Sequence, residues 1–114
     1  MPEKTPPALR PSGAAPVFAA LGDPVRLAII DRLCAGGPLP TIRLQQGRLL
    51  SRQAITKHLR VLERAGLVCS SRSGRDRLWQ LQERQLVRMR EYLDRMSVQW
   101  DERLARLKLL VEAE

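Results

Sequence analysis

Apolar positions recur at helical spacing from residue 17 onward, and glycine or proline marks each break. Residues 17–21 predict a short helix. Asp23 followed by Pro24 is typical of a helix N-cap and first turn, so we expect a second helix from Pro24 until the Gly-Gly-Pro run at 36–38 ends it. A less regular stretch predicts a short helix near residues 41–47.

The most regular helical pattern runs from Ser51 to Ala65. Ser51 can accept hydrogen bonds from the backbone of the first turn, and Gly66 follows the last residue as a stop. We therefore expect an amphipathic helix with one apolar and one polar side. Its predicted buried face consists of Ile55, Leu59 and Leu62.

Two strand-like runs follow, residues 67–72 and 77–81, joined by the turn-forming sequence Ser-Gly-Arg-Asp at 73–76. They predict a two-stranded β-hairpin. The stretch from 83 to about 112 contains neither glycine nor proline and predicts one helix, about 45 Å long at 1.5 Å per residue. Its apolar residues recur at steps of three and four, which is close to a coiled-coil seam.

The first 16 residues hold five of the eight prolines. Because proline removes a backbone donor and interrupts helices, we expect residues 1–16 to be a flexible arm that contributes nothing to the core. Residues 17–114 then form one domain, mainly α with a small β-hairpin. No stretch approaches the ~20 apolar residues of a membrane span, and no secretion signal is visible, so we expect a cytoplasmic protein without a membrane partner.

The positive charge is concentrated in the middle of the chain. Twenty basic and 12 acidic residues give a net charge of +8, and 17 of the basic residues are arginine. Between Ile42 and Leu78, nine basic residues stand against two acidic ones, a net of +7. This excess of positive charge favours DNA phosphates as the partner, because binding of basic side chains to phosphates releases the counterions condensed on DNA. A net positive charge alone is also compatible with binding to an anionic membrane or to an acidic protein.

The polar side of the 51–65 helix carries the residue types that read base edges and hold phosphates. Such a helix is typical of the recognition helix of a helix-turn-helix, and the hairpin is then a wing whose arginines reach the backbone or a minor groove of double-stranded DNA. The predicted DNA-contacting residues are Ser51, Arg52, Gln53, Thr56, Lys57, His58 and Arg60 on the helix and Arg72, Arg75 and Arg77 in the hairpin. We expect His58 to pack against a neighbouring helix as well as to reach a phosphate.

These segments together resemble the ArsR/SmtB-type winged helix-turn-helix repressors. The resemblance rests on LGDPVRLAIIDRL, SRQAITKHLRVLERAGLV and SSRSGRDRLWQL and covers residues 17–82. It implies a homodimer that binds a roughly palindromic operator, usually as an autorepressor, with the first and last helices at the dimer interface. The run QWDERLARLKLL, from Gln99 to Leu110, is similar to a subgroup whose members are often not metal sensors.

The interface implied by this resemblance coincides with the apolar seam of the last helix. Methionine and aromatic residues on that seam could also line a ligand cavity, but their heptad-like spacing favours a dimer contact. The predicted interface residues are Val17, Phe18, Leu21, Leu86, Met89, Leu93, Met96, Trp100, Leu104 and Leu107.

The chain departs from the family pattern in two places. The usual acidic helix before the recognition helix is replaced by the basic and polar run IRLQQGR at 42–48, and the Cys-x-Cys motif and last-helix ligands of metal sensors are missing from the sequence. We therefore expect no metal and no cofactor. Cys34 is predicted to be a buried thiol. Cys69, alone or with Cys34, is a candidate redox or thiophilic-metal switch. No other sensor site is visible, so the effector is unassigned.

An enzyme is disfavoured. The sequence has no glycine-rich phosphate loop, and Ser51 and His58 lie two turns apart on one helix, beyond hydrogen-bonding reach. The sequence thus predicts a sequence-specific, DNA-binding transcriptional regulator, a dimeric repressor of winged helix-turn-helix fold. The alternatives are the thiol-responsive repressor described above and a non-specific basic module that binds DNA or a protein.

Overall fold

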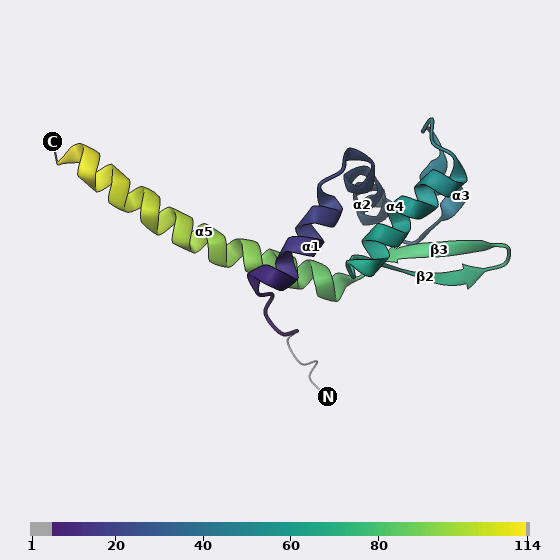
Figure 1. Ribbon diagram of the computed structural model, residues 1–114, viewed down its shortest axis with the longest axis horizontal. Helices are drawn as coiled ribbons and strands as arrows, with labels where there is room; N and C mark the ends of the chain where they lie inside the picture. Colours follow the sequence, from purple (N-terminus) through teal and green to yellow (C-terminus); the bar gives the residue numbers. More distant parts are fainter. Residues whose placement is uncertain (1–5, 114) are drawn as a thin grey trace.

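In the computed structural model, which describes residues 6–113, a cluster of short helices and a β-hairpin lies at one end of a long helix (Figure 1). The elements are α1 (Pro11–Leu21), α2 (Pro24–Gly36), β1 (Leu39–Pro40), α3 (Thr41–Gln45), α4 (Arg52–Arg64), β2 (Val68–Ser73), β3 (Asp76–Leu81) and α5 (Glu83–Glu112). The far half of α5 extends away from the rest, so the molecule measures 66 × 43 × 25 Å. The mainly helical winged fold predicted from the sequence is confirmed.

The sheet has three antiparallel strands in the order β1-β3-β2. The hairpin pairs residues from Val68 opposite Leu81 out to Ser73 opposite Asp76, so the turn is as predicted. The sequence prediction missed β1, in which Leu39 pairs with Trp79. A strand of two residues carries no periodicity, and Pro40 fits only because β1 is an edge strand that pairs on one side.

The predicted helix caps are confirmed. Asp23 Oδ1 accepts hydrogen bonds from the N–H groups of Val25 (2.8 Å) and Arg26 (3.1 Å) at the start of α2. Ser51 Oγ accepts one from Ala54 N (3.1 Å) at the start of α4. Gly66 follows α4 with a φ of 77°, a left-handed conformation that side chains with a Cβ rarely adopt.

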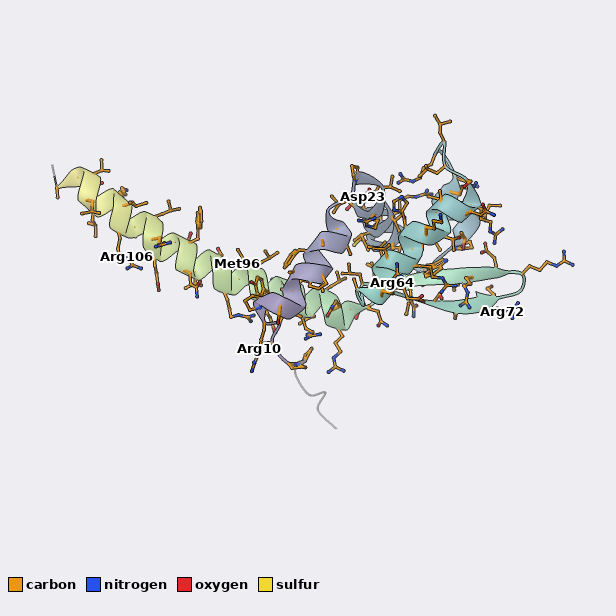
Figure 2. All side chains as sticks on the ribbon, in the orientation of Figure 1. Arg10, Asp23, Arg64, Arg72, Met96 and Arg106 are labelled. Carbon is orange, nitrogen blue, oxygen red and sulfur yellow. The ribbon has the colours of Figure 1, made fainter. Side chains whose placement is uncertain are left out.

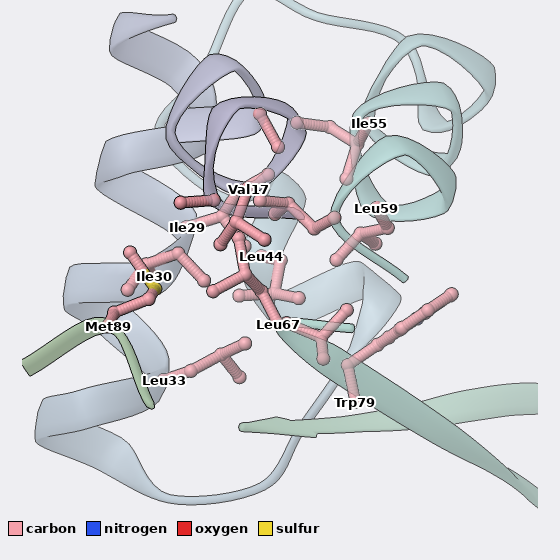
Figure 3. Packing of buried hydrophobic residues seen from close by; sticks show 14 of the residues in the cluster. Val17, Ile29, Ile30, Leu33, Leu44, Ile55, Leu59, Leu67, Trp79 and Met89 are labelled. Atoms are coloured by element: carbon pink, nitrogen blue, oxygen red, sulfur yellow. The ribbon is translucent and has the colours of Figure 1, made fainter. Parts of the chain in front are cut away.

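One apolar core joins all the helices to the sheet (Figure 3). The predicted buried face of α4 is confirmed, because Ile55, Leu59 and Leu62 are each fully buried. Trp79 on β3 is the largest fully buried side chain and closes the core on the wing side. Only the first part of α5 takes part, through Met89 and residues partly buried beside it.

The expectation that residues 1–16 contribute nothing to the core is wrong for the later part of that stretch. Helix α1 begins at Pro11, and Leu9 and Ala14 are buried in the core cluster. Proline is compatible with the first turn of a helix because the N–H it lacks has no helical partner there. Arg95 Nη2 on α5 donates a hydrogen bond to Leu9 O (3.0 Å) and holds the segment against α5. Residues 1–5 lie outside the described range.

The predicted burial of Cys34 is also wrong, because its side chain is exposed. Helix α2 buries Ile29, Ile30 and Leu33, while Leu27, which lies two turns before Cys34, is 47% exposed. Both sides of α2 are apolar in sequence, so the periodicity alone did not decide which side faces the core. Within residues 6–113, no single helix is long and apolar enough to cross a membrane; α1 and α2 pass that test only as a pair, bent by 91°.

Candidate nucleic-acid interface

The outward side of α4 carries a polar and basic stripe opposite the buried face. Gln53, Lys57, Arg60 and Arg64 follow one another at helical spacing, and all four are exposed. Lys57 and Arg64 have no carboxylate within ion-pair distance among residues 6–113. The stripe therefore combines an amide that can read a base edge with cations that can contact phosphates.

Arg52, the first residue of α4, points toward the wing. Its Nη2 lies 2.8 Å from Oδ1 of Asp76, which directly follows the hairpin turn, and its side chain is still 54% exposed. Asp76 also accepts hydrogen bonds from Arg77 N (2.7 Å) and Ile42 N (3.4 Å). This carboxylate thus joins the wing, the start of α3 and the start of α4.

Burial acts to raise the pKa of Asp76, but the hydrogen bonds it accepts outweigh that effect. The N–H of Arg77, the hydroxyl of Thr41, the N–H of Ile42 and the charge of Arg52 together hold the pKa below its usual value of 3.8. Asp76 is therefore ionised at neutral pH and forms a true ion pair with Arg52.

Arg60 is held in a similar way by the second acid of the basic segment. Its Nη1 lies 2.8 Å from Glu63 Oε1, and its guanidinium lies 5.5 Å from the centre of the Trp79 ring. Ser70 Oγ on β2 donates to Glu63 Oε2 (3.4 Å) and accepts from Arg77 Nη1 (3.0 Å). Both acids between residues 42 and 78 thus hold an arginine of α4 beside the sheet.

Two of the predicted contacts are hydroxyls that already bind the backbone of their own helix. Ser51 Oγ accepts the capping hydrogen bond from Ala54 N, and Thr56 Oγ1 donates to Arg52 O (2.8 Å). Ser51 retains its hydroxyl proton as a free donor, whereas Thr56 is only partly exposed and its hydroxyl proton is engaged.

His58 lies between α4 and the start of α2, away from the outward stripe. Its Nδ1 is 3.3 Å from Arg26 Nη1 and 4.0 Å from Asp23 Oδ1. The N–H of Arg26, together with that of Val25 and the nearby charges of His58 and Arg26, holds the pKa of Asp23 below its usual value. The packing role predicted for His58 matches this position, whereas a phosphate contact by His58 stays a prediction.

The wing presents its arginines to solvent. Arg72 and Arg77 lie directly opposite each other in the hairpin register, and Arg75 is in the turn; all three are exposed. Figure 2 shows Arg72 at the outer end of the hairpin, beyond α4. The wing therefore adds positive charge beside the N-terminal end of α4.

The predicted interface residues divide into two groups. Val17 and Met89 are buried within the single chain, and Phe18 packs against Tyr92 with ring centroids 5.8 Å apart. Along the far part of α5, the seam is open to solvent, with a shallow hollow over Trp100, Leu104 and Leu107. The half-exposed or more exposed seam residues are Leu93, Met96, Trp100, Leu104 and Leu107.

The two candidate thiols are both free and lie on different elements. Cys34 is exposed on α2, and Cys69 is partly buried on β2, where Gln80 Nε2 lies 3.5 Å from its sulfur. Among residues 6–113 there is no group of three His, Cys, Asp or Glu side chains that could hold a metal ion.

Sequence reasoning missed the two acids that organise this surface. Asp76 and Glu63 were counted only as charges, although each holds an arginine. The partners of Asp76 are 24 and 34 residues away in sequence, so no local spacing indicates them. One feature of the sequence could have indicated this role. Glu63 and Asp76 are the only two acids among nine basic residues between 42 and 78, so an arginine near each of them could have been expected.

Comparison with known proteins places this geometry among helix-turn-helix proteins. Residues 21–69 match the family model described as a helix-turn-helix domain. The chain is 39% identical over 97 residues to the HTH-type transcriptional regulator Rv2034 of Mycobacterium tuberculosis, covering 85% of this chain and 87% of that protein.

Solved structures agree with this relationship. An ArsR-like transcriptional regulator from Rhodococcus sp. RHA1 is 35% identical, with a TM-score of 0.71 over 87% of this chain and 92% of that one. An ArsR family transcriptional regulator is 25% identical, with a TM-score of 0.74 over 83% of this chain and 97% of that one.

Proposed function

Because this chain belongs to the ArsR/SmtB-type family of helix-turn-helix transcriptional regulators, and so is a DNA-binding regulator, we propose that it is a homodimeric repressor of a two-fold symmetric operator. The observation that carries the proposal is the joint exposure of the α4 stripe and the wing arginines on one basic segment. The operator includes DNA upstream of its own gene.

In this proposal α4 enters the major groove. Gln53 and Lys57 face the bases and the flanking phosphates, and Ser51 reaches a phosphate with its hydroxyl. The wing follows the backbone, with Arg72 and Arg75 beside the adjacent minor groove. DNA supplies the counter-charge that the segment lacks.

The dimer forms through the far half of α5. A monomer leaves Trp100 66% and Leu104 50% exposed along one seam, and a second copy of the same seam would cover both. The resulting dimer would present two recognition helices about 34–36 Å apart, which is one helical turn of DNA. A palindromic operator follows from that symmetry.

The test is a selection from a randomised DNA library with the full-length protein, followed by competitive anisotropy at physiological salt. We expect the selection to return a palindromic motif that is present upstream of the protein's own gene. The protein should bind this motif with an affinity about 10³-fold or more above its affinity for random DNA. Gln53→Ala should lower that ratio, whereas the matched change Gln99→Ala on α5 should leave it intact.

The opposite result would favour the alternative function. If the selection returns no motif, and binding is equal for all sequences and collapses with salt, the basic surface is a non-specific DNA-binding module.

A further inference from the structure

We propose that Arg52 reads a guanine in the major groove and that Asp76 is the positioning residue that orients it. This inference rests on the proposed function and specifies one base contact of the same surface. It follows from the way the Arg52 guanidinium is held in the DNA-free protein.

The location of Arg52 suits a base contact. It is the first residue of α4, and residues near the N-terminus of a recognition helix are those that contact base edges. Its side chain is 54% exposed although one nitrogen is engaged. The ion pair uses Nη2 on one side of the guanidinium, so other N–H donors of the planar fork remain available to a ligand.

Asp76 is itself fixed by several groups. It receives hydrogen bonds from Arg77 N and from Ile42 N, which directly follows Thr41 in the chain. Thr41 is buried, and its Oγ1 accepts a hydrogen bond of 3.0 Å from Trp79 Nε1 in the core. The orientation of Arg52 is therefore set by a chain of contacts that ends in the hydrophobic core.

Electrostatics decides between a base and a phosphate as the ligand. A carboxylate at 2.8 Å largely neutralises the guanidinium and repels a second anion, so Arg52 is a poor partner for a phosphate. Guanine presents two neutral acceptors, O6 and N7, whose spacing matches two parallel N–H groups of arginine. An oriented guanidinium also loses less side-chain freedom when it binds such a pair.

The other basic residues of the surface provide the contrast. Lys57, Arg72 and Arg75 have no carboxylate within ion-pair distance among residues 6–113. These side chains keep their full charge and suit phosphates. The acids therefore separate unpaired cations, which suit phosphates, from two paired arginines. Of these two, Arg60 is held by Glu63 beside the Trp79 ring, and only Arg52 lies at the N-terminal end of α4, where base edges are contacted.

The experiment starts from the motif selected with wild-type protein. For each G·C pair of the half-site, affinity is measured against the other three base pairs and against 7-deazaguanine, which lacks the N7 acceptor but keeps Watson–Crick pairing. We expect one G·C pair at which wild type discriminates roughly 5- to 150-fold. Arg52→Lys, which keeps the charge but loses the fork, should abolish discrimination and the 7-deazaguanine effect at that pair only.

Asp76→Asn should give a different signature. The freed charge of Arg52 should strengthen binding to random DNA, while discrimination at the same G·C pair falls. The matched changes Arg90→Lys and Asp94→Asn, on exposed positions of α5, should alter neither quantity. Circular dichroism and thermal melting would establish that each variant is folded.

Two results would overturn the inference. One is unchanged discrimination at every G·C pair in both Arg52→Lys and Asp76→Asn. The other is an equal loss of affinity for all sequences in Arg52→Lys, which would make Arg52 a phosphate contact. A wild-type selection without any motif would instead overturn the proposed function itself.

Discussion

Trp79 Nε1 donates a hydrogen bond of 3.0 Å to Oγ1 of Thr41, and both residues are buried. Thr41 begins α3 and Trp79 lies in β3, so this bond ties the helix-turn-helix to the wing. The guanidinium of Arg60 on α4 covers the same indole ring at 5.5 Å. The wing is therefore anchored to α3 and α4 through contacts of one buried indole ring.

Thr41→Val should destabilise the protein by about 1–3 kcal/mol, because it leaves a buried indole N–H without a partner. The double variant Thr41→Val/Trp79→Phe should lose less than the sum of the two single changes, since it removes both partners. Urea unfolding at fixed protein concentration measures each value. The control is Thr56→Val, at a partly exposed threonine, which should cost about 0.5 kcal/mol or less. Additive losses would contradict the coupling.

Most of the fold could be predicted because its signals are local. The helices of residues 24–35, 51–65 and 83–112 each begin at a capping or helix-favouring position and have regular apolar spacing. The hairpin turn is equally local. What the sequence did not indicate depends on tertiary contacts: the pairing of β1 with β3, the docking of Leu9 near α5, and the side of α2 that faces solvent.

The candidate site shows the same division. The residues on the outward side of α4 could be predicted from the spacing of its apolar residues, since the position of the buried face fixes which residues lie on the opposite face. The role of Arg52 could not, because its carboxylate partner comes from a strand 24 residues away. The pairing of Arg60 with Glu63 is a local signal that was overlooked, since the two residues are three apart in one helix. A count of charges treats the nine basic residues between 42 and 78 alike. The structure shows that Arg52 and Arg60 form ion pairs with carboxylates, whereas residues such as Lys57 and Arg72 do not among residues 6–113.

The Asp76 ion pair should make stability depend on acid pH. Its folded pKa lies below the usual value of 3.8, so the carboxylate stabilises the fold above pH 3.8, and this contribution is lost as the pH falls through the folded pKa. The free energy of unfolding of wild type should therefore exceed that of Asp76→Asn at neutral pH, and the gap should narrow below pH 3.8. A gap that stays constant down to pH 2 would contradict the prediction.

The unpaired wing arginines should determine the salt dependence of DNA binding. If Arg72 and Arg75 each contact one phosphate, alanine at either position should reduce the slope of log K against log salt by about 0.9 per protomer. Affinity should fall about equally for operator and random DNA, because phosphate contacts carry no base information. Arg90→Ala, the same change on α5, serves as the control. An unchanged slope in both wing variants would mean that the wing stays off the backbone.

The seam of α5 should hold two chains together. Leu104→Lys places a charge on the exposed apolar seam, whereas Val98→Lys places the same charge on the opposite side of the helix, where Val98 is similarly exposed at 59%. Each dimer carries the change twice because a two-fold interface repeats every contact. Fully burying a leucine is worth roughly 1.5–3 kcal/mol, and Leu104 is already half-buried in the single chain. Losing the remaining burial twice should therefore weaken dimerisation by at least about 10-fold. Sedimentation equilibrium would show Leu104→Lys dissociating at concentrations where wild type and Val98→Lys remain dimeric. Equal behaviour of the two variants would place the dimer contact elsewhere on the chain.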